Sequence, residues 1–248
     1  MATIYILWLR QLKRYFRSRA RLIGSLGQPL LFLIALGFGF GPIYQRAGGG
    51  SYIQFLTPGI IAMSVLFTAM FSGIEIIWDR QFGFLKETLV APVSRLEIMI
   101  GRTLGGATVA MIQGITVFLI SFLAGFRLAD LSGSLIMILF MFLISLLFTA
   151  LGTAIASVLE DMQGFQLIMN FLVMPLFFLS GALFPLAGLP RTLTIIASLD
   201  PLSYGVDGLR GALGLGYHFS FMEDFLVLAV ASCLFLVIGS YLFSKIEL

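Results

Sequence analysis

LSGSLIMILFMFLISLLFTALGTAIASVL, residues 131–159, lies between Asp130 and Glu160 and contains no charged residue. A helix needs about 20 predominantly apolar residues to cross the hydrocarbon core of a bilayer, and this run is longer. Its apolar residues are continuous and do not alternate with polar ones, which favours a helix over a strand of a membrane barrel. The stretch therefore predicts a transmembrane helix and, with it, the class of the whole fold.

Five more stretches of the chain have the same character. Uncharged runs lie between Arg21 and Arg46, Arg102 and Arg127, Asp161 and Arg191, and Asp224 and Lys245, and another from about Pro58 to Trp78 is interrupted only by Glu75. The composition agrees, with 59% hydrophobic and 11% charged residues and a mean hydropathy of +1.05, against roughly 25% charged residues in soluble domains. We expect an all-α membrane protein with six transmembrane helices in a single domain, residues 1–248.

The basic residues predict the orientation of these helices. With an even number of crossings both termini lie on one side. Eleven of the fifteen Lys and Arg residues then share the side of residues 10–21, and only Arg46, Arg127, Arg191 and Arg210 lie opposite. Basic residues favour the cytoplasmic side, so both termini are expected in the cytoplasm. The pI is near 9.2, but basic residues at the membrane edges meet anionic lipid headgroups, which argues against nucleic-acid binding.

Three segments outside the crossings differ from the rest. Residues 1–21 place apolar side chains and a basic stripe on separate helix faces, which predicts a helix in the inner membrane interface. The stripe contacts either lipid alone or also a cytoplasmic partner. Residues 79–100 are too polar to cross and are expected to form a short helix along the membrane surface. Residues 185–223 contain prolines and charges, which predicts two short helices that enter the outer leaflet and return, as a lid.

Residue types that carry several kinds of chemistry are scarce. The single cysteine, Cys233, and the single histidine, His218, cannot form a disulfide or a multi-histidine metal cluster within one copy. None of Lys13, Lys86 and Lys245 follows a glycine-rich loop, so the chain is expected to lack the phosphate-binding loop of an ATPase. With His218 outside the crossings, a membrane-embedded hydrolase with a serine, histidine and carboxylate set is disfavoured.

Several stretches carry a family resemblance. They are SYIQFLTPGIIAMSVLF (51–67), FLKETLVAPVSR (84–95), SGALFPLAGLP (180–190) and LDPLSYGVDGLRGAL (199–213). Together they resemble the type-2 permeases of ATP-binding cassette (ABC) transporters, a group that includes drug, antibiotic and polysaccharide exporters. The resemblance covers nearly the whole chain. One departure is Asp200 before Pro201, where the family more often has asparagine, and both residues suit a turn ahead of proline.

The resemblance implies an interfacial N-terminal helix, a cytoplasmic coupling helix, re-entrant outer helices, and a dimer with a second copy or a related permease. ATP and Mg would be bound by a separate cytoplasmic ATPase, and this chain would bind no cofactor. By position, the residues that couple to the ATPase would be Phe84, Leu85, Lys86, Glu87, Leu89, Pro92, Val93 and Arg95. The charges among them would set the register by pairing with the ATPase, unless they meet only headgroups or solvent.

The resemblance also implies an outer re-entrant gate. Its residues would be Gly181, Phe184, Pro185, Pro201, Tyr204, Asp207 and Arg210. Asp207 and Arg210 are three residues apart, so on a helix they would share a face and form a local ion pair. Tyr204 would anchor the segment at the interface.

Four residues within the crossings are candidates for the transport pathway or an interface: Glu75, Phe171, Phe177 and Phe178. An ionisable group inside a crossing is a functional candidate by default, although the preferred interpretation is that Glu75 reaches the interface or pairs with a basic residue of the N-terminal helix. The phenylalanines either line a path for amphipathic cargo or face lipid and neighbouring helices.

The expected function is that of the membrane subunit of an ABC exporter in the plasma membrane of a prokaryote. It would move an amphipathic drug, antibiotic or lipid-like molecule outward, using ATP hydrolysed on the separate subunit. Export of a polysaccharide or lipid-linked glycan on the same framework is an alternative. A secondary transporter driven by an ion gradient is another alternative. Such transporters have buried acidic residues and broken helices, and only Glu75 and Pro175 fit that description here.

Overall fold

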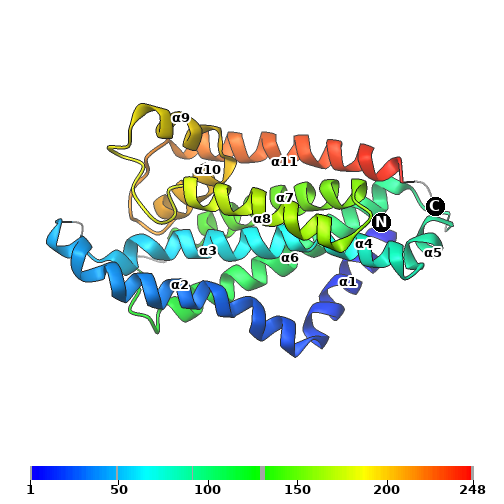
Figure 1. The fold of residues 1–248 in the computed structure, drawn as a ribbon, viewed down its shortest axis with the longest axis horizontal. Coiled ribbons are helices and arrows are strands. Elements are labelled where there is room, and N and C mark those ends of the chain that lie inside the picture. The colour runs from blue at the N-terminus through cyan, green and yellow to red at the C-terminus, as the bar shows by residue number, and fades with distance from the viewer. Residues whose placement is uncertain (1, 49, 91, 129–131, 247–248) are drawn as a thin grey trace.

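Eleven helices make up the part of the chain that the computed structural model describes, which is residues 2–48, 50–90, 92–128 and 132–246 without the side chains of residues 20, 21, 86 and 89. The helices are α1 (Ala2–Arg17), α2 (Arg19–Arg46), α3 (Tyr52–Phe71), α4 (Ile74–Gln81), α5 (Phe84–Val90), α6 (Arg95–Ser121), α7 (Ser134–Val158), α8 (Met162–Leu179), α9 (Arg191–Leu199), α10 (Pro201–Ala212) and α11 (Phe221–Ser244). These described residues contain no strand (Figure 1). The predicted all-α class is confirmed.

Six stretches of helix are long and apolar enough to cross a membrane. They are Leu22–Arg46, Tyr52–Gln81, Arg95–Ser121, Ser134–Val158, Met162–Leu179 and Phe221–Ser244. The second is built from α3 and α4 in succession, and the fourth, α7, lies within the uncharged run of residues 131–159. The prediction of six crossings is confirmed, and the chain is a multi-pass membrane protein.

Side-chain capping fixes where several helices begin. The hydroxyl of Ser94 accepts a hydrogen bond from the backbone N–H of Glu97 at the start of α6. Ser220 and Glu223 form a reciprocal capping box at the start of α11. Such caps satisfy backbone donors that the first turn of a helix leaves without a partner.

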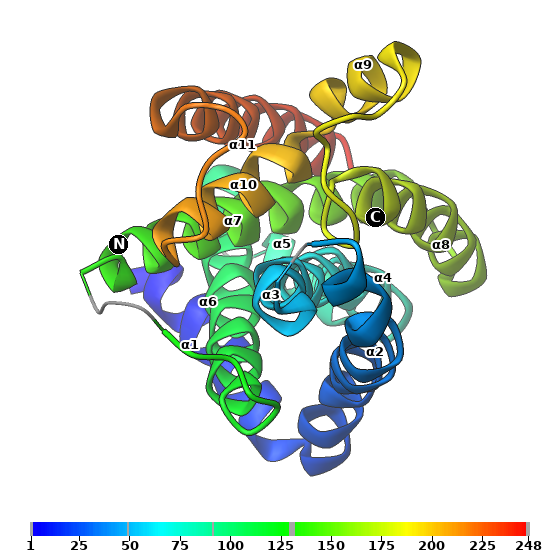
Figure 2. The ribbon, with the colours of Figure 1, turned by 90° about the vertical axis from the view of Figure 1, so that its left-hand side faces the viewer.

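The long helices are arranged around a central trio. Most residues in the apolar part of α3, α6 and α7 are buried, whereas only 17–22% of those in α2, α8 and α11 are buried, and these helices would face lipid or another subunit. Figure 2 shows α3 surrounded by its neighbours, with α2 and α1 on one side and α11 on the other. Helix α1 packs along α6, and α11 packs along α7.

Glycines allow the central helices to approach closely. A Cβ atom on Gly73 would collide with the carbonyl oxygen of Gly152 in α7, and a Cβ atom on Gly152 would collide with that of Met70 in α3. Backbones that touch in this way gain dispersion contacts, which drive helix association when the surroundings are as apolar as the helices.

The two ends of the bundle carry different short helices. Figure 1 shows α4, α5 and both chain ends toward one end, and α9 and α10 toward the other. We call these the α5 end and the α9 end. Chain ends on a common side agree with an even number of crossings.

Candidate functional site

Five charged residues from three helices meet at the α5 end. Arg10 and Arg14 come from α1, Glu75 and Asp79 from α4, and Arg102 from α6. We call this group the charge cluster. α1 supplies its arginines at positions 10 and 14, and α4 supplies its carboxylates at 75 and 79. That spacing of four residues puts each pair on one helix face.

Asp79 is the centre of the charge cluster. Its carboxylate receives both terminal nitrogens of Arg10, with Nη1–Oδ2 at 3.0 Å and Nη2–Oδ1 at 2.9 Å. Arg102 Nη2 donates to Asp79 Oδ2 at 2.5 Å. Asp79 is 5% exposed and Arg102 is 3% exposed. A buried guanidinium is costly unless it is paired, so Asp79 is what makes the position of Arg102 tolerable.

Glu75 pairs with the N-terminal helix. Arg14 Nη1 lies 3.7 Å from Glu75 Oε2 and 3.9 Å from Asp79 Oδ1. Glu75 is 3% exposed, and a buried carboxylate needs a counter-charge, which Arg14 of α1 provides. This is the pairing that the sequence offered as the alternative to a transport role, and the transport role stays a prediction.

The charge cluster connects directly to the predicted coupling helix, which is α5. The guanidinium carbon of Arg10 lies 3.9 Å from the ring centroid of Phe84, the first residue of α5. A cation over an aromatic face is attracted by the ring quadrupole. One side chain of α1 therefore holds both α4, through Asp79, and α5, through Phe84.

Two further arginines tie residues 79–100 to other crossings. Arg80 donates to the carbonyl oxygens of Ser157 at 3.0 Å and Leu159 at 3.2 Å, at the end of α7. Arg95 Nη1 donates to the carbonyl oxygens of Ser244 at 2.7 Å and Ile246 at 3.0 Å, at the end of α11. Cations at the C-terminal end of a helix satisfy carbonyls that the helix leaves without donors. The Arg95 side chain is therefore engaged within the chain.

The other predicted coupling residues differ in exposure. Phe84, Glu87 and Pro92 are exposed and Val93 is half-buried, whereas Leu85 is fully buried in the core and supports α5 from behind. The side chains of Lys86 and Leu89 lie outside the described part of the chain.

Two exposed apolar residues of this segment were missed by sequence reasoning. Phe82 is 81% exposed and Val90 is 80% exposed. The sequence could have indicated them, because each is an apolar residue in a segment that is otherwise rich in charged residues. Large exposed apolar side chains at one end of the bundle are candidates for an interaction surface.

At the α9 end, Arg210 of α10 is buried among three elements. Its Nη2 donates to the carbonyl oxygen of Gly181 at 2.6 Å, and its guanidinium carbon lies 4.0 Å from the ring centroid of Phe55 in α3. Burial lowers the pKa of Arg210 to about 10, and the charge of Asp207 opposes that shift. Gly181 has a φ of +74°, a conformation that suits glycine and aims its carbonyl group.

Asp207 and Arg210 share α10, but each forms hydrogen bonds with other residues. The carboxylate of Asp207 accepts from the backbone N–H groups of His218 and Phe219, each at 2.8 Å. The charge of Asp207 acts on Arg210 through electrostatic attraction. The hydrogen bonds of Arg210 and Asp207 fasten α10 to Gly181 and to the segment before α11. Tyr204 stacks on Phe219 with centroids 4.6 Å apart.

The turn into α10 rests on Asp200 and Pro201. Asp200 Oδ1 accepts a hydrogen bond from the N–H of Leu202 at 2.8 Å, and Pro201 occupies the first helical position. Proline suits the first helical position because a backbone N–H there would have no acceptor within the helix, so its absence removes no hydrogen bond. Asp200 is 5% exposed, and burial raises its pKa to about 7.

Helix α10 lies against α7 rather than on the molecular surface. A Cβ atom on Gly205 would crowd Ile144, and one on Gly208 would crowd the ring of Phe140. Helix α9 has the opposite character, since Ala197 is its only buried residue among those described. The two short helices predicted between residues 185 and 223 are present, and their path through the membrane stays a prediction.

Three of the predicted residues gather around one apolar cavity at the α9 end. Phe178, Phe184 and Pro185 line it together with Tyr52 and parts of α2, and its volume is about 500 Å³. Phe177 is fully buried and packs edge-on against Phe32 of α2. Phe171 is 85% exposed on α8. The pathway phenylalanines therefore do not share one cavity.

The described residues contain no group of three or more His, Cys, Asp or Glu that could hold a metal ion. The arrangement instead offers two mechanical features. One is an exposed short helix fastened to several crossings, and the other is a pair of short helices fastened over the opposite end.

Comparison with known proteins identifies the chain. Its residues 2–213 match the family described as "ABC-2 type transporter". The "Putative transport permease ycf38" of Porphyra purpurea is 31% identical over 247 residues, covering 93% of this chain and 84% of that protein. "Nodulation protein J" of Rhizobium leguminosarum bv. trifolii is 29% identical over 240 residues, covering 96% and 87%. The chain belongs to the ABC-2 type transporter family, as a transport permease with membrane-spanning helices.

Proposed function

We propose that this chain is the membrane subunit of an exporter driven by a separate ATPase, which binds ATP and Mg and docks on residues 79–100. Family membership supports an ATP-binding cassette partner in general terms. The observation that carries the proposal is the α5 end, where Phe82 before α5 and Val90 at its last position are exposed, and α5 itself is fastened to α1.

The mechanism we propose is a lever. Closure of the ATPase would displace α5, and the displacement would pass through Arg10 to α1, through Arg80 to α7 and through Arg95 to α11. Hydrogen-bonded and packed elements of this kind transmit a shift as a switch between two arrangements. ATP binding would favour one arrangement and hydrolysis would restore the other.

The cargo in this proposal is an amphipathic drug, antibiotic or lipid-like molecule that leaves the cell. The apolar cavity beside Phe178 and Phe184 supports an apolar portion in the cargo. A polysaccharide or lipid-linked glycan is the second candidate, favoured by the uncharged polar cavity described below. The ion-coupled alternative has less support, because Glu75 lies beside Arg14.

The assembly in this proposal contains a second copy of the chain or a related permease, with surrounding membrane lipid. Three crossings, α2, α8 and α11, have few buried residues within this chain and leave room for such a neighbour. The proposed location is the plasma membrane of a prokaryote, with both termini and the α5 end in the cytoplasm. The distribution of basic residues supports this orientation.

Substitution of Val90 tests the docking of the ATPase. A charge buried in an apolar interface is expected to cost more than 1 kcal/mol, so Val90→Asp should weaken binding of the ATPase at least about fivefold. The matched control is Leu123→Asp, because Leu123 is 88% exposed and follows α6 at the α9 end. The readout is the ATPase retained on the tagged permease after purification in detergent.

We expect Leu123→Asp to retain the ATPase and Val90→Asp to lose it, with both permeases equally abundant in the membrane. Equal retention by the two variants would refute docking at α5. A permease that accumulates its cargo in vesicles without any ATPase would refute the proposed function as a whole.

A further inference from the structure

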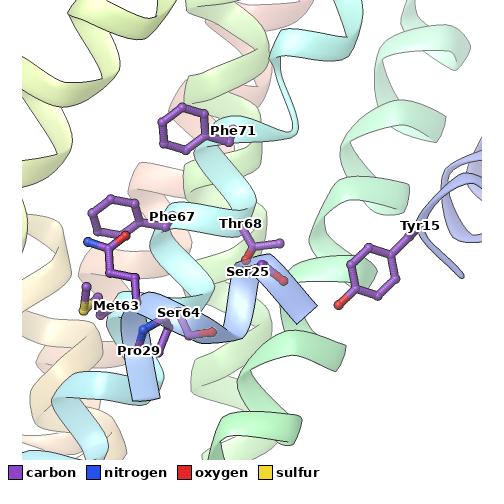
Figure 3. Close-up of a pocket in the computed structure, with 10 residues that line it drawn as sticks. Tyr15, Ser25, Pro29, Met63, Ser64, Phe67, Thr68 and Phe71 are labelled. Carbon is purple, nitrogen blue, oxygen red and sulfur yellow. The ribbon is translucent and has the colours of Figure 1, made fainter. Parts of the chain in front are cut away.

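A cavity of about 230 Å³ lies between α1, α2 and α3 in the half of the bundle near the α5 end. Its polar lining includes Ser25 and Gln28 from α2 and Ser64 and Thr68 from α3. Figure 3 shows Ser25 close to Ser64 and Thr68, with Tyr15 reaching toward them from α1. A water molecule needs roughly 30 Å³ of liquid volume, so the space is large enough for a ring-sized group.

The chemistry of the described lining is polar but uncharged. Among the residues whose side chains the structure describes, no Lys, Arg, Asp or Glu lines the cavity, and the hydrogen-bonding groups are hydroxyls and one amide. Phe67 and Phe71 supply aromatic surface along α3 (Figure 3). Sites that combine apolar walls with a few convergent polar groups are typical of small-molecule recognition. Without a counter-charge, such a site disfavours a phosphate or an ammonium group.

Ser64 gives a second and independent sign of a ligand. Its side chain is 1% exposed, and its Oγ has no hydrogen-bond partner among the described residues. An unpaired buried hydroxyl costs free energy that a bound partner would recover. By contrast, Ser25 Oγ donates to the carbonyl oxygen of Leu22 at 3.2 Å and is partly satisfied within its own helix.

The position of the cavity suggests where a ligand would enter. One wall is α2, only 17% of which is buried in its most apolar part, so the cavity lies next to a surface that lipid could cover. An amphiphile in the nearer half of the bilayer would place its head group in the cavity and keep its chain among lipids.

We propose that this cavity binds the uncharged, hydroxyl-bearing head group of an amphiphile, such as the sugar of a glycolipid, and is where cargo is loaded. Ser64 would accept or donate a hydrogen bond to a hydroxyl of the ligand, and the aromatic rings would contact its less polar face. The role in loading rests on the proposed function, whereas binding itself is a property of this chain.

Thiol protection in the purified chain tests the binding. Cys233 is the only cysteine and is exposed, so Cys233→Ser provides a background for Ser25→Cys as a reporter at the cavity. Ser240→Cys is the matched control, because Ser240 is also partly buried but lines a different, largely apolar cavity between α6 and α11. The probes are dodecyl glucoside and dodecylphosphocholine, which share a chain and differ in head group.

We expect the glucoside to slow maleimide labelling at position 25 but not at 240, and the phosphocholine to protect neither. Adding Ser64→Ala should raise the glucoside concentration needed for protection about fivefold, which corresponds to one lost hydrogen bond. Ser64→Ala removes only an unpaired hydroxyl, so folding should be unaffected. Equal protection by both probes, or no effect of Ser64→Ala, would overturn the proposal.

Failure of this inference and failure of the proposed function are distinguishable. Protection at position 25 together with a permease that binds no ATPase would leave the site standing and refute the export complex. An intact, ATPase-dependent complex with an unprotected position 25 would refute the site alone.

Discussion

Asp79 accepts hydrogen bonds from two arginines that come from different helices, Arg10 from α1 and Arg102 from α6. Only one of these arginines is fully buried, since the Arg10 side chain is 30% exposed and that of Arg102 is 3% exposed. Water can therefore solvate Arg10 if the carboxylate is lost, but it cannot readily solvate Arg102. The stability of the α5 end should depend most on the Asp79–Arg102 contact.

Replacing Asp79 with Asn tests this dependence. The buried charge of Arg102 would lose its counter-charge, and breaking a buried pair typically costs about 3–5 kcal/mol. We expect Asp79→Asn to lower the unfolding temperature of the purified permease substantially. Glu160→Gln makes the same change in charge at an exposed position and should have little effect. Matching unfolding temperatures for the two variants would show that Asp79 contributes no net stability.

Asp200 predicts how stability depends on pH. Burial raises the pKa of Asp200 from 3.8 to about 7, so the folded chain binds a proton more tightly than the unfolded chain. The contribution of Asp200 to the free energy of unfolding is fully present below about pH 4 and is lost as the pH rises to about 7. Its size is a few kcal/mol.

Asp200→Asn should remove this contribution to the pH dependence. The amide oxygen can still accept the N–H of Leu202 and carries no charge. We expect the variant to be more stable than the parent at pH 8 and to show a flatter profile between pH 4 and 7, measured by unfolding in detergent. A less stable variant at pH 8 would mean that the carboxylate is stabilised there.

The individual partners of these residues were only partly predictable. An acidic residue within an apolar run favours a nearby counter-charge, so pairing of Glu75 with the N-terminal helix was one of the alternatives that the sequence offered, and Arg14 is the partner. The hydrogen bonds of Arg10 and Arg102 to Asp79 span 69 and 23 residues, respectively. No local pattern specifies which of several basic residues such a carboxylate selects.

At the scale of elements, α1 is fastened along α6 by hydrogen bonds and close contacts. Trp8 donates to Thr108 at 3.0 Å, and Tyr15 donates to Gln113 at 2.6 Å. Gly105 leaves no side chain between the two helices, and a Cβ atom there would lie 2.6 Å from Cγ of Gln11. If α1 carries motion from α5, this contact must remain intact.

Gly105→Val should separate α1 from α6. Overpacking a tight contact typically costs about 1–3 kcal/mol, and the displaced α1 would carry Arg10 away from Phe84. We expect lower stability and reduced stimulation of the ATPase by the permease. Gly39→Val is the control, because a Cβ atom on Gly39 meets nothing within 4 Å. Normal ATPase stimulation in a folded Gly105→Val variant would exclude α1 from the lever.

The elements themselves were largely predictable, but their packing was not. Long uncharged runs specify crossings because hydrocarbon admits few alternatives to a helix, and all six were found. The burial of Leu85 and the exposure of Val90 were not predictable, because α5 has only seven residues and too little periodicity to identify its packed face. The polar cavity between α2 and α3 combines residues about 40 positions apart, and each appears unremarkable in its own helix.

For the whole molecule, the fold places a fastened exposed helix at one end and two short fastened helices at the other (Figure 1). The crossings α3, α6 and α7 form a buried centre between these ends, while α2, α8 and α11 surround it. Such a body is suited to transmitting a displacement from one end to the other. The energy for that displacement would come from the docked ATPase.

Site-specific photo-crosslinking from the assembled, membrane-embedded complex tests this docking most directly. A photoreactive amino acid at Val90 would report what lies against α5, and one at Leu123 would report the α9 end. We expect ATPase to be captured from position 90 and not from position 123. Capture from position 123 alone, or no capture from position 90 in an intact complex, would contradict docking of the ATPase on α5.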